Sequence, residues 1–90
     1  MHVNYSDLTP KQKHHMARIY LWISTYRREF WWGEDSEYSE RTIKSLIRKG
    51  LLLEFSKYAV DITDRGEEIG RSCFVRTNEH DAYAVEIGFM

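Results

Sequence analysis

The sequence lacks the features that cross-link a small protein or attach it to a membrane. It contains one cysteine, Cys73, which excludes an internal disulfide and a cysteine-based zinc site. No apolar run approaches the ~20 residues of a membrane-spanning helix, and the first residues lack the apolar segment of a secretion signal. Both absences favour a protein of the reducing cytoplasm that has no membrane partner.

A strong excess of one charge is also lacking. The 90 residues carry 13 Lys and Arg against 14 Asp and Glu, a net charge of −1. Residues 1–50 hold nine Lys and Arg and six Asp and Glu, a net +3, whereas residues 51–90 hold four and eight, a net −4. A near-neutral chain does not have the overall charge of a typical nucleic-acid-binding protein. If nucleic acid is the partner, a local surface must supply the attraction.

The chain does contain enough apolar residues for one folded domain. Hydrophobic residues make up 42% of it and aromatic residues 14%, which excludes a fully disordered chain. Ninety residues are too few for a second hydrophobic core. We predict a single domain over residues 1–90, with a core over about 8–72 and a C-terminal extension over about 75–90.

A first helix is predicted over residues 10–28. Thr9 is placed to cap it, the only proline, Pro10, occupies the first helical position, and Gln12 completes a capping box. Apolar residues then follow at spacings of three and four, so one stripe of the helix faces a core. These residues are Met16, Ile19, Tyr20, Ile23 and Tyr26.

A second helix is predicted over residues 40–49. Ser39 is a favoured N-cap, and Glu40 lies in the first turn, where the helix dipole favours negative charge. Gly50 can adopt the left-handed conformation that ends a helix, and Leu51 is then placed to contact Leu46.

The period of the apolar residues then changes from 3.6 to 2, which predicts two short strands with a turn near Ser56 and Lys57. Thr63 follows as the N-cap of a short third helix. In that helix Gly66, Gly70 and Cys73 share one face, which indicates close packing against a neighbour. The expected fold class is α+β, with the order α-α-β-β-α.

The C-terminal extension has two features. Residues 77–81 have the composition of a turn, and residues 82–89 alternate like a strand. Such a strand could form a hairpin with residues 74–76, join the sheet of the preceding hairpin, or pair across a dimer.

The most informative segment is the second helix with the hairpin that follows it. Arg41, Lys44, Ser45 and Arg48 are spaced i, i+3, i+4, i+7, and they therefore form one stripe. The apolar residues of this helix point the opposite way, towards the core. A narrow helix with outward arginines suits the major groove, because a guanidinium can form two bonds to guanine. Lys57 near the hairpin tip would touch the minor groove or the backbone.

These segments together resemble the winged helix-turn-helix family, in particular its short MarR-like members of phages, plasmids and bacteria. The resemblance rests on the pattern L-x-x-x-G-L at Leu46–Leu51 and the pattern I/L-T-x-x-G at Ile62–Gly66. It covers about residues 8–72 and implies that residues 40–49 form the recognition helix. Arg65, at the start of the third helix, could then reach the sugar-phosphate backbone of the same duplex.

The chain departs from the family in two ways. Only residues 29–38 are available for the helix that normally precedes the recognition helix. That loop carries Glu34, Asp35 and Glu37, whose carboxylates would repel phosphates near the recognition helix. The same fold also serves in protein-binding modules, so an alternative is an adaptor that binds a protein and not DNA. Its anchoring residues would be Trp31, Trp32 and Tyr38.

Other chemistry is not indicated by the sequence. No Ser/His/Asp set or carboxylate pair has a spacing that suggests catalysis, and the adjacent His14 and His15 point to different sides of the first helix. We therefore expect no enzymatic activity, metal or cofactor. The leading hypothesis is a small transcriptional regulator that binds double-stranded DNA in a sequence-specific way. Since one such domain binds weakly, we expect a homodimer, formed through the first helix or residues 82–89.

Overall fold

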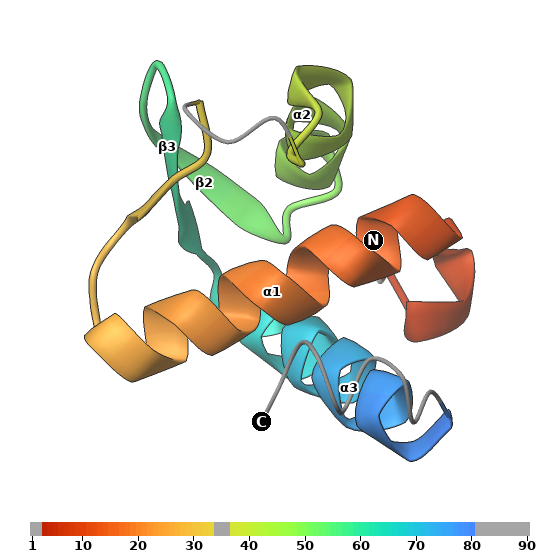
Figure 1. The fold of residues 1–90 in the computed structure, drawn as a ribbon. Coiled ribbons are helices and arrows are strands. Elements are labelled where there is room, and N and C mark those ends of the chain that lie inside the picture. Colours follow the sequence, from red (N-terminus) through yellow and green to blue (C-terminus); the bar gives the residue numbers. More distant parts are fainter. Residues whose placement is uncertain (1–2, 34–36, 81–90) are drawn as a thin grey trace.

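The computed structural model describes residues 3–33 and 37–80. A short 3-10 helix, η1, precedes three α-helices and three strands (Figure 1). The elements are η1 (Tyr5–Asp7), α1 (Pro10–Tyr26), β1 (Phe30–Trp31), α2 (Glu40–Arg48), β2 (Leu52–Ser56), β3 (Ala59–Ile62) and α3 (Asp64–His80). The α+β class predicted from the sequence is therefore confirmed, and the arrangement is compatible with a small winged-helix-like fold.

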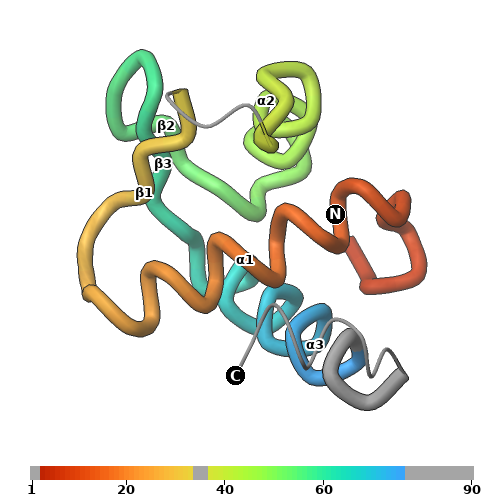
Figure 2. Tube along the Cα trace, viewed as in Figure 1, coloured from red at the N-terminus to blue at the C-terminus, as the bar shows by residue number. Residues whose placement is uncertain are grey.

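The three strands form one antiparallel sheet in the order β1-β3-β2. The pairing sets Trp31 opposite Ala59 and Leu53 opposite Asp61. Helices α1 and α3 lie side by side in both views of the chain (Figures 1 and 2) and share the most extensive contact between any two described elements. Helix α2 lies at the other side of α1, next to β2. The hydrophobic core fills the space between the helices and the inner face of the sheet.

This core draws on the three α-helices and on the sheet. Its fully buried side chains include Met16 and Ile19 of α1, Ile43 of α2, Leu52 of β2 and Cys73 of α3. The predicted core position of Cys73 is therefore confirmed. The segment before α1 contributes as well, because Val3 and Leu8 are buried in the same cluster.

The helix ends follow the predicted caps. The Thr9 hydroxyl accepts the Gln12 amide hydrogen at 3.2 Å, and the Gln12 side chain accepts that of Thr9 at 2.9 Å. At the start of α2 the Ser39 hydroxyl accepts the Thr42 amide hydrogen at 3.4 Å. At the end of α2, Gly50 has φ +79°, and the Leu51 amide donates to the Leu46 carbonyl at 3.1 Å. This is the Schellman ending predicted from the sequence.

The two sequence patterns behind the family resemblance meet in space. The Thr63 hydroxyl donates to the Gly50 carbonyl at 2.7 Å and accepts the Gly66 amide hydrogen at 2.9 Å. A Cβ at Gly66 would overlap the Leu51 carbonyl oxygen, so only glycine allows the start of α3 to lie this close. The hydrogen bonds of Thr63 and the close approach at Gly66 hold the end of α2 against the start of α3.

Three element predictions need correction. The observed order differs from α-α-β-β-α by the strand β1, which sequence periodicity did not predict. Helix α1 ends at Tyr26, two residues early, because Arg27 adopts the left-handed conformation with φ 58°. Residues 77–80 were predicted to begin a turn, but they continue α3, which is therefore not short. The predicted strand over residues 82–89 lies outside the described residues.

One residue that was predicted to face the core is exposed, and the structure shows which side chains of β2 face solvent. Tyr26 belongs to the stripe predicted to face the core, yet 60% of its surface is exposed. On β2, Leu52 is buried, whereas Leu53 and Phe55 are 54% and 57% exposed. The hairpin therefore turns two large apolar side chains towards solvent.

Candidate nucleic-acid interface

Helix α2 has one buried and one charged face. Ile43 and Leu46 are completely buried, so the helix is anchored in the core through that side. Arg41, Lys44 and Arg48 are exposed on the opposite side. The structure thus brings together the three cations that the sequence placed on one stripe.

The two arginines of this stripe have free guanidinium groups. Within the part of the chain that the structure describes, neither Arg41 nor Arg48 forms an ion pair or a side-chain hydrogen bond. Lys44 differs, because its ammonium lies 3.9 Å from the Glu40 carboxylate, one helical turn away. Arg41 and Arg48 are consequently the groups best able to bind an external anion.

Ser45 forms hydrogen bonds within the fold, whereas the sequence suggested a contact with DNA. Its hydroxyl donates to the Thr42 carbonyl at 2.7 Å and accepts a hydrogen from the Gln12 side-chain amide at 2.9 Å. Ser45 is also half-buried. Both of these bonds fasten α2 to itself and to α1, so Ser45 positions the helix and is not a protruding contact group.

The family's helix before the recognition helix has no counterpart among the described residues between β1 and α2. Two polar side chains of α1 hold α2 in place instead. Gln12 reaches Ser45 as described, and the buried His15 accepts the Ser39 amide hydrogen on its Nε2 atom at 3.2 Å. Burial lowers the pKa of His15, and the neighbouring His14 and Lys11 lower it further, so the ring is neutral and able to accept this bond.

The surface next to the charged face is concave and basic. Arg48 and Lys49 line an open groove of about 680 Å³ at the C-terminal end of α2, together with Ser45, Gly50 and Val3. Lys49 was not among the predicted contact residues, because its position next to the helix end does not show on which side it lies. Lys57 is exposed in the turn of the hairpin, with its ammonium 5.3 Å from the centre of the Tyr58 ring.

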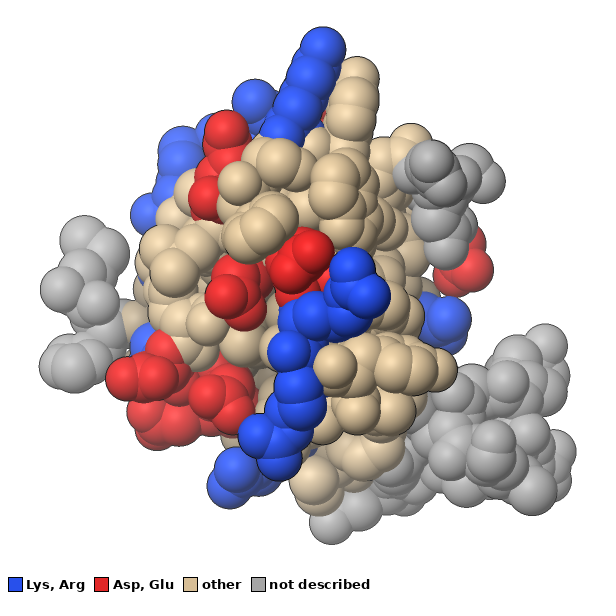
Figure 3. Space-filling view, turned by 90° about the vertical axis from the view of Figure 1, so that its left-hand side faces the viewer, with Lys and Arg blue, Asp and Glu red and all other residues tan. Residues whose placement is uncertain are grey.

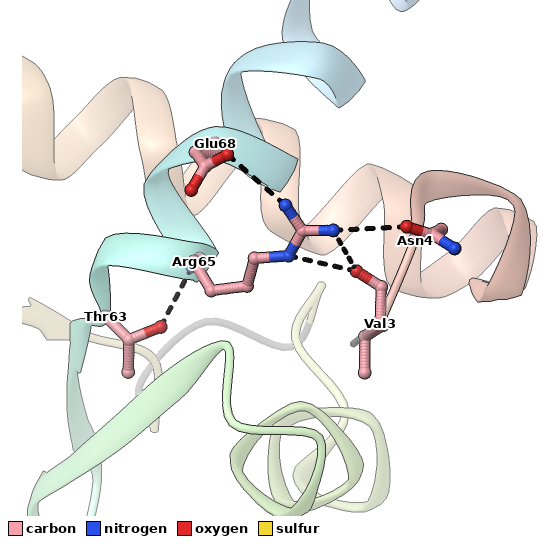
Figure 4. A network of polar contacts seen from close by, with 6 residues as sticks. Val3, Asn4, Thr63, Arg65 and Glu68 are labelled. Carbon is pink, nitrogen blue, oxygen red and sulfur yellow. Dashed lines mark hydrogen bonds and ion pairs between the residues drawn. The ribbon is translucent and has the colours of Figure 1, made fainter. Parts of the chain in front are cut away.

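The guanidinium of Arg65 is bound within the chain. Its guanidinium donates to the Val3 carbonyl at 2.7 and 3.1 Å and to the Asn4 side chain at 3.2 Å, and it pairs with Glu68 at 3.3 Å (Figure 4). Its predicted contact with a DNA backbone is thus replaced by a contact within the chain. The residue fastens the N-terminal segment to α3.

The residues proposed for the adaptor alternative separate into two groups. Trp32 and Tyr38 are buried in the core, where the Tyr38 ring packs against Phe30 and His15. They cannot anchor a partner without leaving the core. Trp31 remains accessible, with 51% of its surface exposed on the outer side of β1.

Charge elsewhere on the described surface is mixed. Figure 3 shows the side that lies on the left in Figure 1, and red and blue atoms lie beside one another across it. A groove between the end of α1, β3 and α3 has charges of both signs in its lining, which includes Arg27, Arg28, Arg71, Glu29, Asp61 and Glu67. Of the acidic loop, Glu37 is exposed just before α2, and Glu34 and Asp35 lie outside the described residues.

No group of three His, Cys, Asp or Glu side chains that could hold a metal ion occurs among the described residues. None of the helices described is both long and apolar enough to cross a membrane. Comparison of the chain with protein-family models, with curated proteins and with solved structures found no match.

Proposed function

We propose that this protein binds double-stranded DNA through the exposed face of α2, as a small transcriptional regulator of the MarR-like winged-helix type. The observation that carries the proposal is the pair of free guanidiniums, Arg41 and Arg48, held outward by a helix whose other face is buried. The two residues are seven apart, so they lie on one side of the helix and can both face one groove.

The neighbouring groups extend this surface. Lys44 and Lys49 add positive charge along and beside α2, and Lys57 projects from the hairpin that serves as the wing. In this arrangement the arginines contact guanine edges and the lysines contact phosphates. Ser45 is left out, because its hydroxyl is used within the fold, and so is Arg65.

Fluorescence anisotropy with a labelled random duplex at low salt tests the proposal. The double variant Arg41→Gln/Arg48→Gln should bind at least about 30-fold more weakly, because each arginine contact contributes ~1–3 kcal/mol. On a random duplex, which offers no fixed guanine, the two arginines meet phosphates instead, so their loss should also flatten the plot of log affinity against log salt by roughly 1.8.

The matched control is Arg27→Gln/Arg28→Gln, which removes the same two charges at the far end of α1. It should leave affinity within about threefold, since only the general charge has changed. Absence of binding by the wild-type protein even at very low ionic strength would refute the proposal, as would equal losses in both double variants.

A further inference from the structure

The outer face of the sheet, turned away from the core, carries one carboxylate between two apolar side chains. The strand pairing sets Leu53 directly opposite Asp61 and Trp31 opposite Ala59, which lies on the same face as Asp61 because the two are two residues apart. Since β3 is the middle strand, Asp61 has Leu53 on one side and Trp31 diagonally on the other. All three side chains are exposed. We call Trp31, Leu53 and Asp61 the sheet site.

The Asp61 carboxylate is held in place but has no cation beside it. Its Oδ1 atom accepts the Ile62 amide hydrogen at 2.8 Å. Within the described part of the chain Asp61 forms no ion pair, not even with the three arginines that line the adjoining groove. The nearest of these in sequence to β1, Arg28, pairs with Glu29 at 3.8 Å instead. The Asp61 carboxylate is therefore available to a cation from outside the chain.

We propose that the sheet site binds a segment of another protein in which a lysine or arginine is flanked by apolar residues. The carboxylate of Asp61 attracts the cationic head group, and the ring of Trp31 offers its negative face to the same charge. Leu53 contacts the aliphatic stem of the cationic side chain and the apolar residues beside it. The three groups together therefore recognise a charge and its apolar surroundings.

The sheet site continues into a groove that can hold the rest of such a segment. Asp61 also lines the open groove of about 700 Å³ between the end of α1, β3 and α3. The lining of this groove includes the apolar Ile23 and Ile62 and the acidic Glu29 and Glu67. Figure 3 shows this side of the molecule, with acidic atoms near its centre. An extended segment with both basic and apolar residues therefore fits the surface from the sheet into the groove.

Charge selects a protein segment over the other possible occupants. Residues 34–36 and 81–90 of this chain contain no lysine or arginine and hold four acidic residues, so neither segment supplies the cation. In a second copy, the same face would bring its own Asp61 against Asp61. The phosphates of a nucleic acid would be repelled in the same way. A basic and apolar segment of another protein has the complementary charge.

Amide NMR titration of the isotopically labelled full chain with synthetic peptides tests the proposal. The first probe alternates lysine and valine over about eight residues, ~27 Å when extended. It should shift the indole signal of Trp31 and the amide signals of Leu53 and Asp61, with a dissociation constant of about 1 mM or below. A peptide of the same length that alternates glutamate and valine should shift none of them. Alternating lysine and serine should bind at least about threefold more weakly, because apolar contact is lost.

Three variants locate the binding. Asp61→Asn keeps the size of the side chain and its acceptor for the neighbouring amide, and it should raise the dissociation constant of the lysine–valine peptide about threefold or more. Leu53→Ser should have a similar effect. Glu54→Gln is the matched control, because Glu54 pairs with the buried Val60 and so lies on the opposite face of β2. It should change the dissociation constant by less than about 1.5-fold. Unchanged amide signals elsewhere will show that each variant is folded.

Four results would overturn the proposal. The first is an absence of shifts with the lysine–valine peptide, and the second is equal binding of the glutamate–valine peptide. The third is an equal loss in the Asp61→Asn and Glu54→Gln variants. The fourth is a single-stranded oligonucleotide that shifts the three sheet-site signals, because the occupant would then be a nucleic acid.

Binding at the sheet site is independent of DNA binding, because the charged face of α2 lies on a different side of the molecule (Figure 1). A DNA duplex should shift amide signals of α2 and leave those of the sheet site in place. Arg41→Gln/Arg48→Gln should bind the lysine–valine peptide like the wild-type protein. Peptide binding without DNA binding therefore contradicts only the proposed function, and DNA binding without peptide binding contradicts only the sheet site.

Discussion

A buried histidine sets the position of the proposed recognition helix. His15 is almost completely inaccessible, and its Nε2 atom accepts the Ser39 amide hydrogen at the N-terminus of α2. Protonation would replace this acceptor by a donor and would place a positive charge at the positive end of the helix dipole. The neutral ring is therefore part of the folded state.

This arrangement predicts how stability depends on pH. Burial and the neighbouring His14 and Lys11 lower the pKa of His15 below its ordinary value of 6.5, so the unfolded chain binds the proton more tightly than the folded chain. The stabilisation is complete above pH 6.5 and is lost as the pH falls from there through the lowered pKa. Urea unfolding between pH 7.5 and pH 4.5 should show a slope of up to about 1.4 kcal/mol per pH unit from this group.

The exposed neighbour His14 provides the control. His15→Gln should reduce the pH dependence of unfolding between pH 4.5 and 7 strongly, whereas His14→Gln should reduce it only slightly, because it removes one of the smaller causes of the lowered His15 pKa and leaves the burial of His15 in place. The assignment is wrong if the two variants have parallel profiles. The charge of Glu37 raises the pKa of His15 slightly, so Glu37→Gln should make the wild-type slope somewhat steeper.

At the level of elements, the junction of α2 with α3 is where glycine matters most. Gly66→Ala would drive a methyl group into the Leu51 carbonyl oxygen, and we expect a loss of about 2–4 kcal/mol in the free energy of unfolding. Gly50 has open space around it but a positive φ, so Gly50→Ala should lose only about 1–2 kcal/mol. Urea midpoints of both variants measure the difference, and a Gly66 variant as stable as the Gly50 variant would contradict the close contact.

The sequence predicts helix starts and ends well because they depend on neighbouring residues. The caps at Thr9, Ser39 and Thr63 and the glycine ending at Gly50 all involve hydrogen bonds within a few positions. Strand β1 is different, since its two residues are defined only by pairing with β3, about 30 residues later. A stretch that short has no periodicity of its own.

For a related reason, the sequence does not show which face of β2 is buried. Leu52 lies between Leu51 and Leu53, so apolar residues fall on both faces and alternation cannot show which one is buried. The three cations of α2 are found from spacing alone, because a helix that buries one stripe must expose the other. The bonds of Ser45 to Gln12 and of Arg65 to Val3 span 33 and 62 positions, and only the tertiary structure reveals them.

Across the whole molecule, stability rests on the packing of α1 against α3. Gly70 allows this approach, because a Cβ there would meet the Tyr20 side chain. Cys73, one turn further along α3, is 1% exposed in the same interface. The thiol is consequently reached by a reagent only when the two helices separate, which disrupts the common core.

Because Cys73 is buried, its rate of modification reports on unfolding of the whole protein. Burial also raises the pKa of the Cys73 thiol to about 11, so the reactive thiolate is scarce at pH 8, in addition to being shielded from the reagent. An aromatic disulfide reagent should therefore modify the folded protein at least about 1,000-fold more slowly than the urea-unfolded chain. In a Cys73→Ala background, Ser24→Cys on the exposed side of α1 should react at nearly the unfolded rate. Stabilising the protein should slow Cys73 alone, and rapid modification of Cys73 in the folded state would show that α3 separates from α1 without global unfolding.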